Sequence, residues 1–199
     1  MNFPKGFYLS YSKVWLYNNN PEEYYLRYVL GHKMPATPQM QLGSIVHKAL
    51  AQPAYPWKRE LQAAGFLSET ERAVAVAIGA TPTAPRLEEE FTLTWKGITI
   101  FGILDATGPG YFRERKVSAP GSWNEQRVAD DLQISFYWWA LTKLGRKVRK
   151  AHLDHINSKT GRVQTFTTTR KKNDLDGIEN LITYVHSELK ANEWDKPRK

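Results

Sequence analysis

Residues 87–117 alternate apolar and polar side chains with a period of two, and this pattern predicts three consecutive β-strands. We place the strands at 87–95, 98–106 and 111–117. Short glycine-containing segments after the first and second strands supply the turns of a meander. A sheet of this kind has to cover its apolar face with other elements, so the pattern restricts the chain to sheet-containing folds.

Helical patterns flank the meander. N-capping residues and helix-start signals before it predict short helices at 11–17, 21–30, 43–51, 60–64 and 68–78. After it we expect a long helix at 125–144, a second hairpin with strands at 148–157 and 162–169, and a final amphipathic helix at 173–191. This order predicts an α/β (α+β) fold, with a central mixed sheet flanked by helices.

The chain has 199 residues, and neither an internal repeat nor a linker divides it. We therefore expect one domain, 1–199. Its parts are a mainly helical segment at 1–86, the meander, helix and hairpin at 87–170, and the last helix at 171–199.

The composition excludes several classes of protein. The chain has no cysteine, which rules out disulfides, zinc bound by cysteine and a cysteine-bound iron–sulfur cluster. No apolar run approaches the roughly 18 residues of a membrane span, and the first residues lack the apolar core of a signal peptide. We expect a soluble, cytoplasmic protein without a membrane partner.

The positive charge of the chain is concentrated in one region. The net charge is +8, and residues 143–172 hold ten Lys or Arg side chains but a single acid, Asp154. The rest of the chain is close to neutral. Such a patch is expected of a surface that faces a polyanion, although it also fits a solvated helix end and hairpin.

Asp105, Glu114 and Lys116 form the triplet in the meander that could carry chemistry. If the turn centres on Pro109-Gly110, Asp105 lies opposite Glu114, and Lys116 shares the face of Glu114. Two carboxylates this close repel each other unless a proton or a cation lies between them, and oxygen ligands favour Mg²⁺ or Mn²⁺. An ordinary solvated face with a cross-strand ion pair is the alternative reading.

Two further positions support the triplet. Gln133 and Tyr137 are four apart on the helix after the meander, so they share a face, and Gln133 is a polar residue in an apolar stretch. His47 lies in a predicted helix, where a lone histidine is more often structural than a ligand. Trp138 and Trp139 could stack on bases; we assign one of them to the core and leave the other open.

An ordered series of short motifs connects these residues. It runs S-x-S, P-x-x-Y-x-x-x-Y, G-x-x-x-H, E-x-x-F, G-x-x-D, E-x-K and Q-x-x-x-Y, over about residues 10–140. The series resembles the PD-(D/E)XK nuclease superfamily, in the branch of the RecB nuclease domain, AddB and the Cas4-like exonucleases. It departs from many members of that branch in lacking the cysteines of an iron–sulfur cluster. The resemblance implies a restriction-endonuclease-like core behind an N-terminal helical segment.

The resemblance also implies roles for individual residues. His47, Asp105, Glu114 and the backbone carbonyl of Arg115 would hold Mg²⁺ or Mn²⁺. Lys116 would be the catalytic lysine. Gln133 and Tyr137 would lie beside the substrate, and Glu88 would be a supporting carboxylate. Independently of the resemblance, the basic region predicts five residues on the DNA backbone: Lys147, Arg149, Lys150, Lys171 and Lys172.

The function expected from this resemblance is a Mg²⁺- or Mn²⁺-dependent deoxyribonuclease, an exonuclease that hydrolyses phosphodiester bonds with metal-activated water. Its partners would be single-stranded DNA or duplex ends, together with recombination or replication proteins. Two alternatives remain open: a catalytically inactive nucleic-acid-binding or accessory subunit of a recombination or repair complex, and a structure-selective endonuclease on the same fold.

Overall fold

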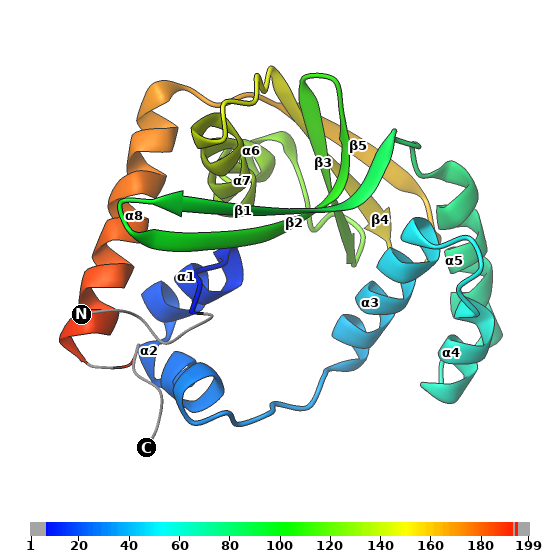
Figure 1. The fold of residues 1–199 in the computed structure, drawn as a ribbon. Helices are drawn as coiled ribbons and strands as arrows, with labels where there is room; N and C mark the ends of the chain where they lie inside the picture. Colours follow the sequence, from blue (N-terminus) through cyan, green and yellow to red (C-terminus); the bar gives the residue numbers. More distant parts are fainter. Residues whose placement is uncertain (1–6, 193, 195–199) are drawn as a thin grey trace.

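The computed structural model describes residues 7–192 and 194, and its centre is a mixed sheet (Figure 1). In the described part of the chain the sheet has five strands in the order β1-β2-β3-β4-β5. They are β1 (Arg86–Trp95), β2 (Ile98–Gly108), β3 (Tyr111–Ser118), β4 (Lys150–Asn157) and β5 (Val163–Thr168). β3 and β4 pair in parallel and the other neighbours pair antiparallel.

Helices precede, connect and follow the strands. Before the sheet come α1 (Tyr11–Asn19), α2 (Pro21–Tyr24), the π-helix η1 (Tyr25–Val29), α3 (Pro38–Ala51), α4 (Trp57–Ala63) and α5 (Ser68–Ala80). The crossover from β3 to β4 contains α6 (Glu125–Ala129) and α7 (Leu132–Lys143), and α8 (Lys172–Ala191) follows β5. A parallel pair requires such a crossover, because a short turn can join only antiparallel neighbours.

Apolar side chains cover both faces of the sheet. Phe112 and Leu153 pack in a core with side chains of α1, α7 and α8. Val117 and Ile156, on the opposite face of the same two strands, pack with α3, α4 and α5. Figure 1 shows α3, α4 and α5 gathered on the right and α8 on the left beside the β1–β2 hairpin. The expected mixed sheet with flanking helices is confirmed.

The main difference from the sequence prediction lies in the segment 125–144. We expected one helix there, but the chain breaks between α6 and α7. Asp131 is the N-cap of α7, and its Oδ1 accepts a hydrogen bond from the backbone N–H of Ile134 over 2.8 Å. A side chain that caps a new helix in this way ends the old one, because capping needs an extended backbone at the cap residue.

Other boundaries shift by smaller amounts. α3 begins at Pro38 rather than at residue 43, because the Thr37 hydroxyl caps it by accepting from the Met40 N–H. The predicted helix at 21–30 is α-helical only as far as Tyr24 and continues as the π-helix η1. None of the described helices is long and apolar enough to cross a bilayer.

The register of the β2–β3 hairpin is the one that the turn predicts. Gly108 pairs with Tyr111, so Pro109 and Gly110 form the two-residue loop, and Gly110 has the positive φ of 79° that such a turn needs. Regular pairing stops at Ala106 and Arg113.

Candidate active site

Asp105 lies where the β2–β3 ladder stops. Its Oδ2 accepts a hydrogen bond from the backbone N–H of Arg115 over 2.6 Å. This N–H thus bonds to a side chain of the neighbouring strand instead of to a backbone carbonyl. Its Oδ1 lies 3.0 Å from Nδ1 of His47 on α3. Residues 58 apart in the sequence are thereby brought into contact.

The contact between His47 and Asp105 shifts both pKa values. Burial lowers the pKa of His47, but the hydrogen bond and the charge of Asp105 outweigh burial and raise it. Burial raises the pKa of Asp105, and the contacts with His47 and the Arg115 N–H outweigh that effect and lower it. Asp105 is therefore the carboxylate of the site that stays ionised.

Glu114 is the second buried carboxyl, with 2% of the residue exposed. Burial and the neighbouring charge of Asp105 raise its pKa well above the usual range. Oε2 accepts a hydrogen bond from Nε2 of Gln133 over 2.8 Å. Oε1 is buried and has no hydrogen-bond partner among the described residues.

Gln133 connects the catalytic candidates of β3 to α7. Its Oε1 accepts a hydrogen bond from Nζ of Lys116 over 2.6 Å, while its Nε2 donates to Glu114. Nζ of Lys116 is also 3.8 Å from Oε2 of Glu114. The same amide lies 3.3 Å from the Tyr137 hydroxyl, which is buried, so Tyr137 reaches the site through Gln133.

Glu88 lies at the opposite edge of the site, where it forms a cluster with Asp105 and His47 that we call the acidic cluster. Its neighbours on β1 pair with Ala106 and Leu104, so Glu88 lies across from Asp105. Ligand atoms of His47, Glu88 and Asp105 lie within 4.8 Å of one another. Glu88 has a φ of 49°, in the left-handed region that non-glycine residues seldom adopt. Such strain persists where the surrounding structure holds it, and it is common at functional sites.

A hollow of about 490 Å³ opens over these groups. His47, Asp105, Glu114, Lys116 and Gln133 line it, together with residues of α3 and β3. The structure thus brings six of the thirteen predicted site residues to one surface, since Arg115 also lines the hollow. The ligand role of the Arg115 carbonyl oxygen stays a prediction.

The predicted DNA-backbone residues divide between two places. Lys147 lines a separate pocket of about 360 Å³ at the β2–β3 turn, and the Arg149 side chain donates to the Pro109 carbonyl beside it. Lys171 is the N-cap of α8, and Nζ of Lys172 pairs with Asp176 at 2.6 Å. Lys150 begins β4, and its backbone N–H donates to the Gly110 carbonyl over 3.4 Å. The role of the five basic residues in binding DNA stays a prediction.

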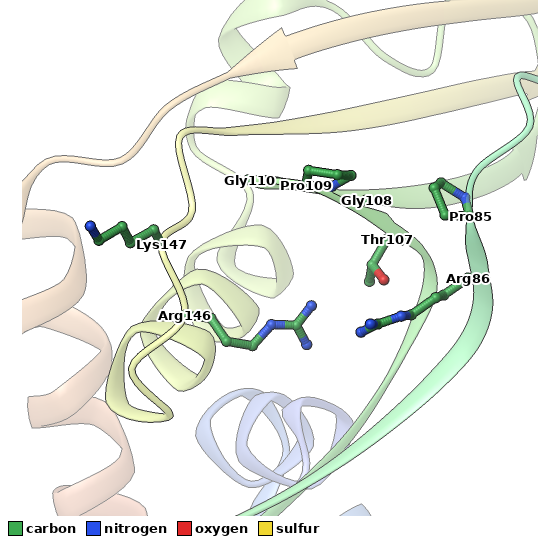
Figure 2. Close-up of a pocket in the computed structure, with 8 residues that line it drawn as sticks. All are labelled: Pro85, Arg86, Thr107, Gly108, Pro109, Gly110, Arg146 and Lys147. Atoms are coloured by element: carbon green, nitrogen blue, oxygen red, sulfur yellow. The ribbon is translucent and has the colours of Figure 1, made fainter.

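The pocket at the turn also contains two arginines that the sequence did not single out. Figure 2 shows the guanidinium groups of Arg86 and Arg146 pointing toward each other and Lys147 pointing away from them. Both arginines pair with Oε1 of Glu89, at 3.2 and 3.1 Å. Arg86 precedes Glu88 by two residues on β1, so the pocket begins about 7 Å of strand from the acidic cluster.

A sequence profile of the PD-(D/E)XK nuclease superfamily matches residues 8–197. The chain belongs to this superfamily. A crystal structure from Eubacterium rectale, named as a putative exonuclease, is similar with a TM-score of 0.65 and 16% sequence identity, covering 88% of this chain and 77% of its own. At that identity the likeness shows the shared fold.

A second solved structure, SSO0001, has a TM-score of 0.46 and 15% identity, covering 88% of this chain and 70% of its own, and this score is too low to establish a shared fold. No curated protein matches the sequence. The superfamily makes the chain a nuclease that hydrolyses nucleic acid, and its members use divalent metal ions. The hollow over Asp105, Glu114 and Lys116 is the candidate active site of that nuclease.

Proposed function

We propose that this chain is a metal-dependent deoxyribonuclease of the RecB, AddB and Cas4-like branch, and that it acts as an exonuclease on DNA ends. On this proposal it works in the cytoplasm with recombination or replication proteins as partners. The whole described chain serves one nuclease domain, in which the helical part before β1 supplies His47 and the sheet supplies the carboxylates.

The observation that carries the proposal is the buried Oε1 of Glu114 beside Asp105, which has no hydrogen-bond partner within residues 7–192 and 194. A buried carboxylate next to another carboxylate needs a proton or a cation as its partner. Oxygen ligands from Asp105, Glu114 and Glu88 and one imidazole nitrogen from His47 suit Mg²⁺ or Mn²⁺. The residues present therefore fit a divalent cation.

Each residue of the site then has a distinct task. A bound divalent cation would polarise the scissile phosphate and lower the pKa of the attacking water. Asp105 and Glu114, with His47 and Glu88, would hold that cation. Lys116, which Gln133 fixes in place, supplies a positive charge beside the position of the phosphate and orients the water.

The basic pocket at the β2–β3 turn supports DNA as the substrate. Its two arginines share the single carboxylate of Glu89, so positive charge remains available for a phosphate group. The pocket starts about two strand residues from Glu88, close enough for a backbone that crosses the active site to continue into it.

Digestion of end-labelled DNA tests this function. We expect linear substrates to be shortened from their ends with Mg²⁺ or Mn²⁺ and to stay intact with a chelator, while covalently closed circles survive. Cleavage of closed circles would instead favour a structure-selective endonuclease. No cleavage of any DNA with either metal would favour an inactive accessory subunit and overturn the proposal.

A further inference from the structure

A second hollow, of about 570 Å³, lies next to the candidate active site. The two hollows share Lys116 and Gln133 in their walls. We call the second one the aromatic hollow; its other lining residues are Tyr11, Trp15, Trp123, Arg127, Asp130, Asp131 and Leu132. A group bound in the aromatic hollow would therefore lie beside Lys116.

The aromatic side chains of this hollow come from two separate segments. Tyr11 and Trp15 are four residues apart on α1, so they share one helix face. The Trp15 residue is 44% exposed, so much of this large apolar side chain is open to solvent. Trp123 precedes α6, and the Arg127 guanidinium carbon lies 4.4 Å from the centre of its ring.

The charges in the aromatic hollow nearly cancel. Two basic residues, Lys116 and Arg127, and two acidic residues, Asp130 and Asp131, line it. Both carboxylates already accept protein hydrogen bonds: Asp130 from Gln126 at 2.7 Å, and Asp131 from the Ile134 N–H at 2.8 Å. A wall with balanced charge and exposed aromatic faces is poorly suited to a phosphate backbone and well suited to a flat, uncharged group.

An unpaired nucleobase is the flat group that a nuclease substrate offers. Stacking on aromatic side chains and on arginine planes is the usual way in which proteins bind single-stranded nucleic acid. In a duplex the base faces are covered by their neighbours, so a base has to be unpaired to enter such a hollow. The buried Trp138 and Trp139 cannot serve here, because 6% and 1% of these residues are exposed.

Building on the proposed function, we propose that the aromatic hollow binds an unpaired base next to the scissile phosphate, with Trp15 as its main stacking residue. The substrate of the active site is then a single-stranded end or overhang. Phosphates lie over Lys116, and the adjoining base turns toward α1 and Trp123.

The test compares Trp15→Ala and Trp15→Phe with Tyr184→Ala in the full chain. Tyr184 is the matched control, since it is an aromatic residue of α8 that is 52% exposed and lies outside both hollows. Binding of a labelled oligothymidylate and of a blunt duplex is measured by fluorescence anisotropy. The measurement is made in an Asp105→Asn background, so that it does not depend on cleavage.

We expect Trp15→Ala to weaken oligothymidylate binding about 5- to 140-fold, the range expected when one base loses its stacking partner. Trp15→Phe should restore most of the affinity, and binding of the blunt duplex should change less than about threefold. In the active chain, Trp15→Ala should lower kcat/KM for single strands but not for blunt duplexes.

Three results would overturn the inference. These are unchanged oligothymidylate binding in Trp15→Ala, an equal loss on single strand and duplex, and a loss that Tyr184→Ala reproduces. A change of oligomeric state in Trp15→Ala with unchanged DNA binding would instead assign Trp15 to a protein interface. If the chain cleaves no DNA, the proposed function fails, but the anisotropy comparison still decides whether the hollow binds bases.

Discussion

Nε2 of Gln133 donates a hydrogen bond to Oε2 of Glu114 over 2.8 Å, while Oε1 of Gln133 accepts one from Lys116 over 2.6 Å. One amide thus holds the carboxyl group of Glu114 and the ammonium group of Lys116, the two residues of the E-x-K motif, in fixed positions relative to each other. It also leaves the other Glu114 oxygen without a protein partner among the described residues. On the proposed function, Gln133 is then a positioning residue and this oxygen of Glu114 is a metal ligand.

Replacing the lysine should abolish cleavage without unfolding the protein. We expect Lys116→Ala to lower kcat by about 10²- to 10⁴-fold, the usual contribution of a positioned acid–base group. Lys190→Ala, an exposed lysine near the end of α8, is the matched control and should keep full activity. If Lys116→Ala keeps more than about a tenth of the activity, the loss is under about 1.4 kcal/mol and Lys116 is not catalytic.

Removing the amide of Gln133 should lower the rate of cleavage, because Lys116 and Glu114 would lose the group that holds them. We expect Gln133→Ala to lower kcat roughly 10- to 100-fold, the range for a residue that orients the groups around a metal, with little change in the Kd for DNA. Gln133→Glu should be worse, because it adds another carboxylate beside Glu114. A fall in affinity with unchanged kcat would show that Gln133 contacts DNA rather than positioning Lys116 and Glu114.

Glu114→Gln should make the metal-free protein more stable. Burial and Asp105 raise the pKa of Glu114, so ionising it in the folded state costs free energy that an amide does not. The difference in unfolding free energy between Glu114→Gln and the wild type should be absent below about pH 4, near the pKa of glutamate in the unfolded chain. It should grow as the pH rises above that value. At neutral pH we expect about 1–3 kcal/mol, or roughly 2–10 °C in Tm.

Thermal unfolding with a chelator, from pH 4 to pH 8, measures this difference. Adding Mn²⁺ should raise the Tm of the wild type more than that of Glu114→Gln, because the variant has lost one ligand oxygen. A variant that is less stable than the wild type at every pH would contradict the assignment of Glu114 as a strained buried carboxyl.

The backbone at Glu88 gives a separate prediction. A left-handed φ costs an L-residue about 1–2 kcal/mol that glycine does not pay. Glu88→Gly should therefore be more stable than Glu88→Ala by about 1 kcal/mol, although both lose the carboxylate and bind Mn²⁺ more weakly. Equal stabilities of the two variants in urea unfolding would show that the strain at this position is not significant.

The basic residues should contribute through charge alone. Neutralising Lys147, Arg149, Lys150, Lys171 or Lys172 singly should weaken DNA binding similarly for all sequences. Wherever the substitution removes one phosphate contact, the plot of log K against log salt should flatten by about 0.9 for duplex or 0.7 for single-stranded DNA. Turnover at saturating DNA should change little. Unchanged affinity and slope in all five variants would place the DNA path elsewhere.

Local sequence patterns predicted the hairpin better than they predicted the helices. The loop of Pro109 and Gly110 fixes the β2–β3 register, and a fixed register decides which side chains face each other. The helix break at Asp131 was missed because apolar residues continue on both sides of it. Asp131 is a good N-cap residue in the sequence, and it could have marked the boundary.

Local sequence patterns predicted only part of the candidate site. The contact between His47 and Asp105 spans 58 residues and depends on how α3 packs against β3, so no periodicity predicts it. The motif series suggested it through the resemblance alone. Neither source pointed to Trp15, since an exposed tryptophan on a short helix has no sequence signal that separates it from a core residue.

Calorimetric titration of the full chain with Mn²⁺ measures whether Glu114 and Asp105 share a divalent cation. The wild type should bind Mn²⁺, and so should Glu90→Gln, which changes an exposed acid on the same strand as Glu88. Glu114→Gln should bind at least about tenfold more weakly, because it loses a ligand oxygen. Equal Mn²⁺ affinity of Glu114→Gln and the wild type would show that Glu114 does not bind the cation.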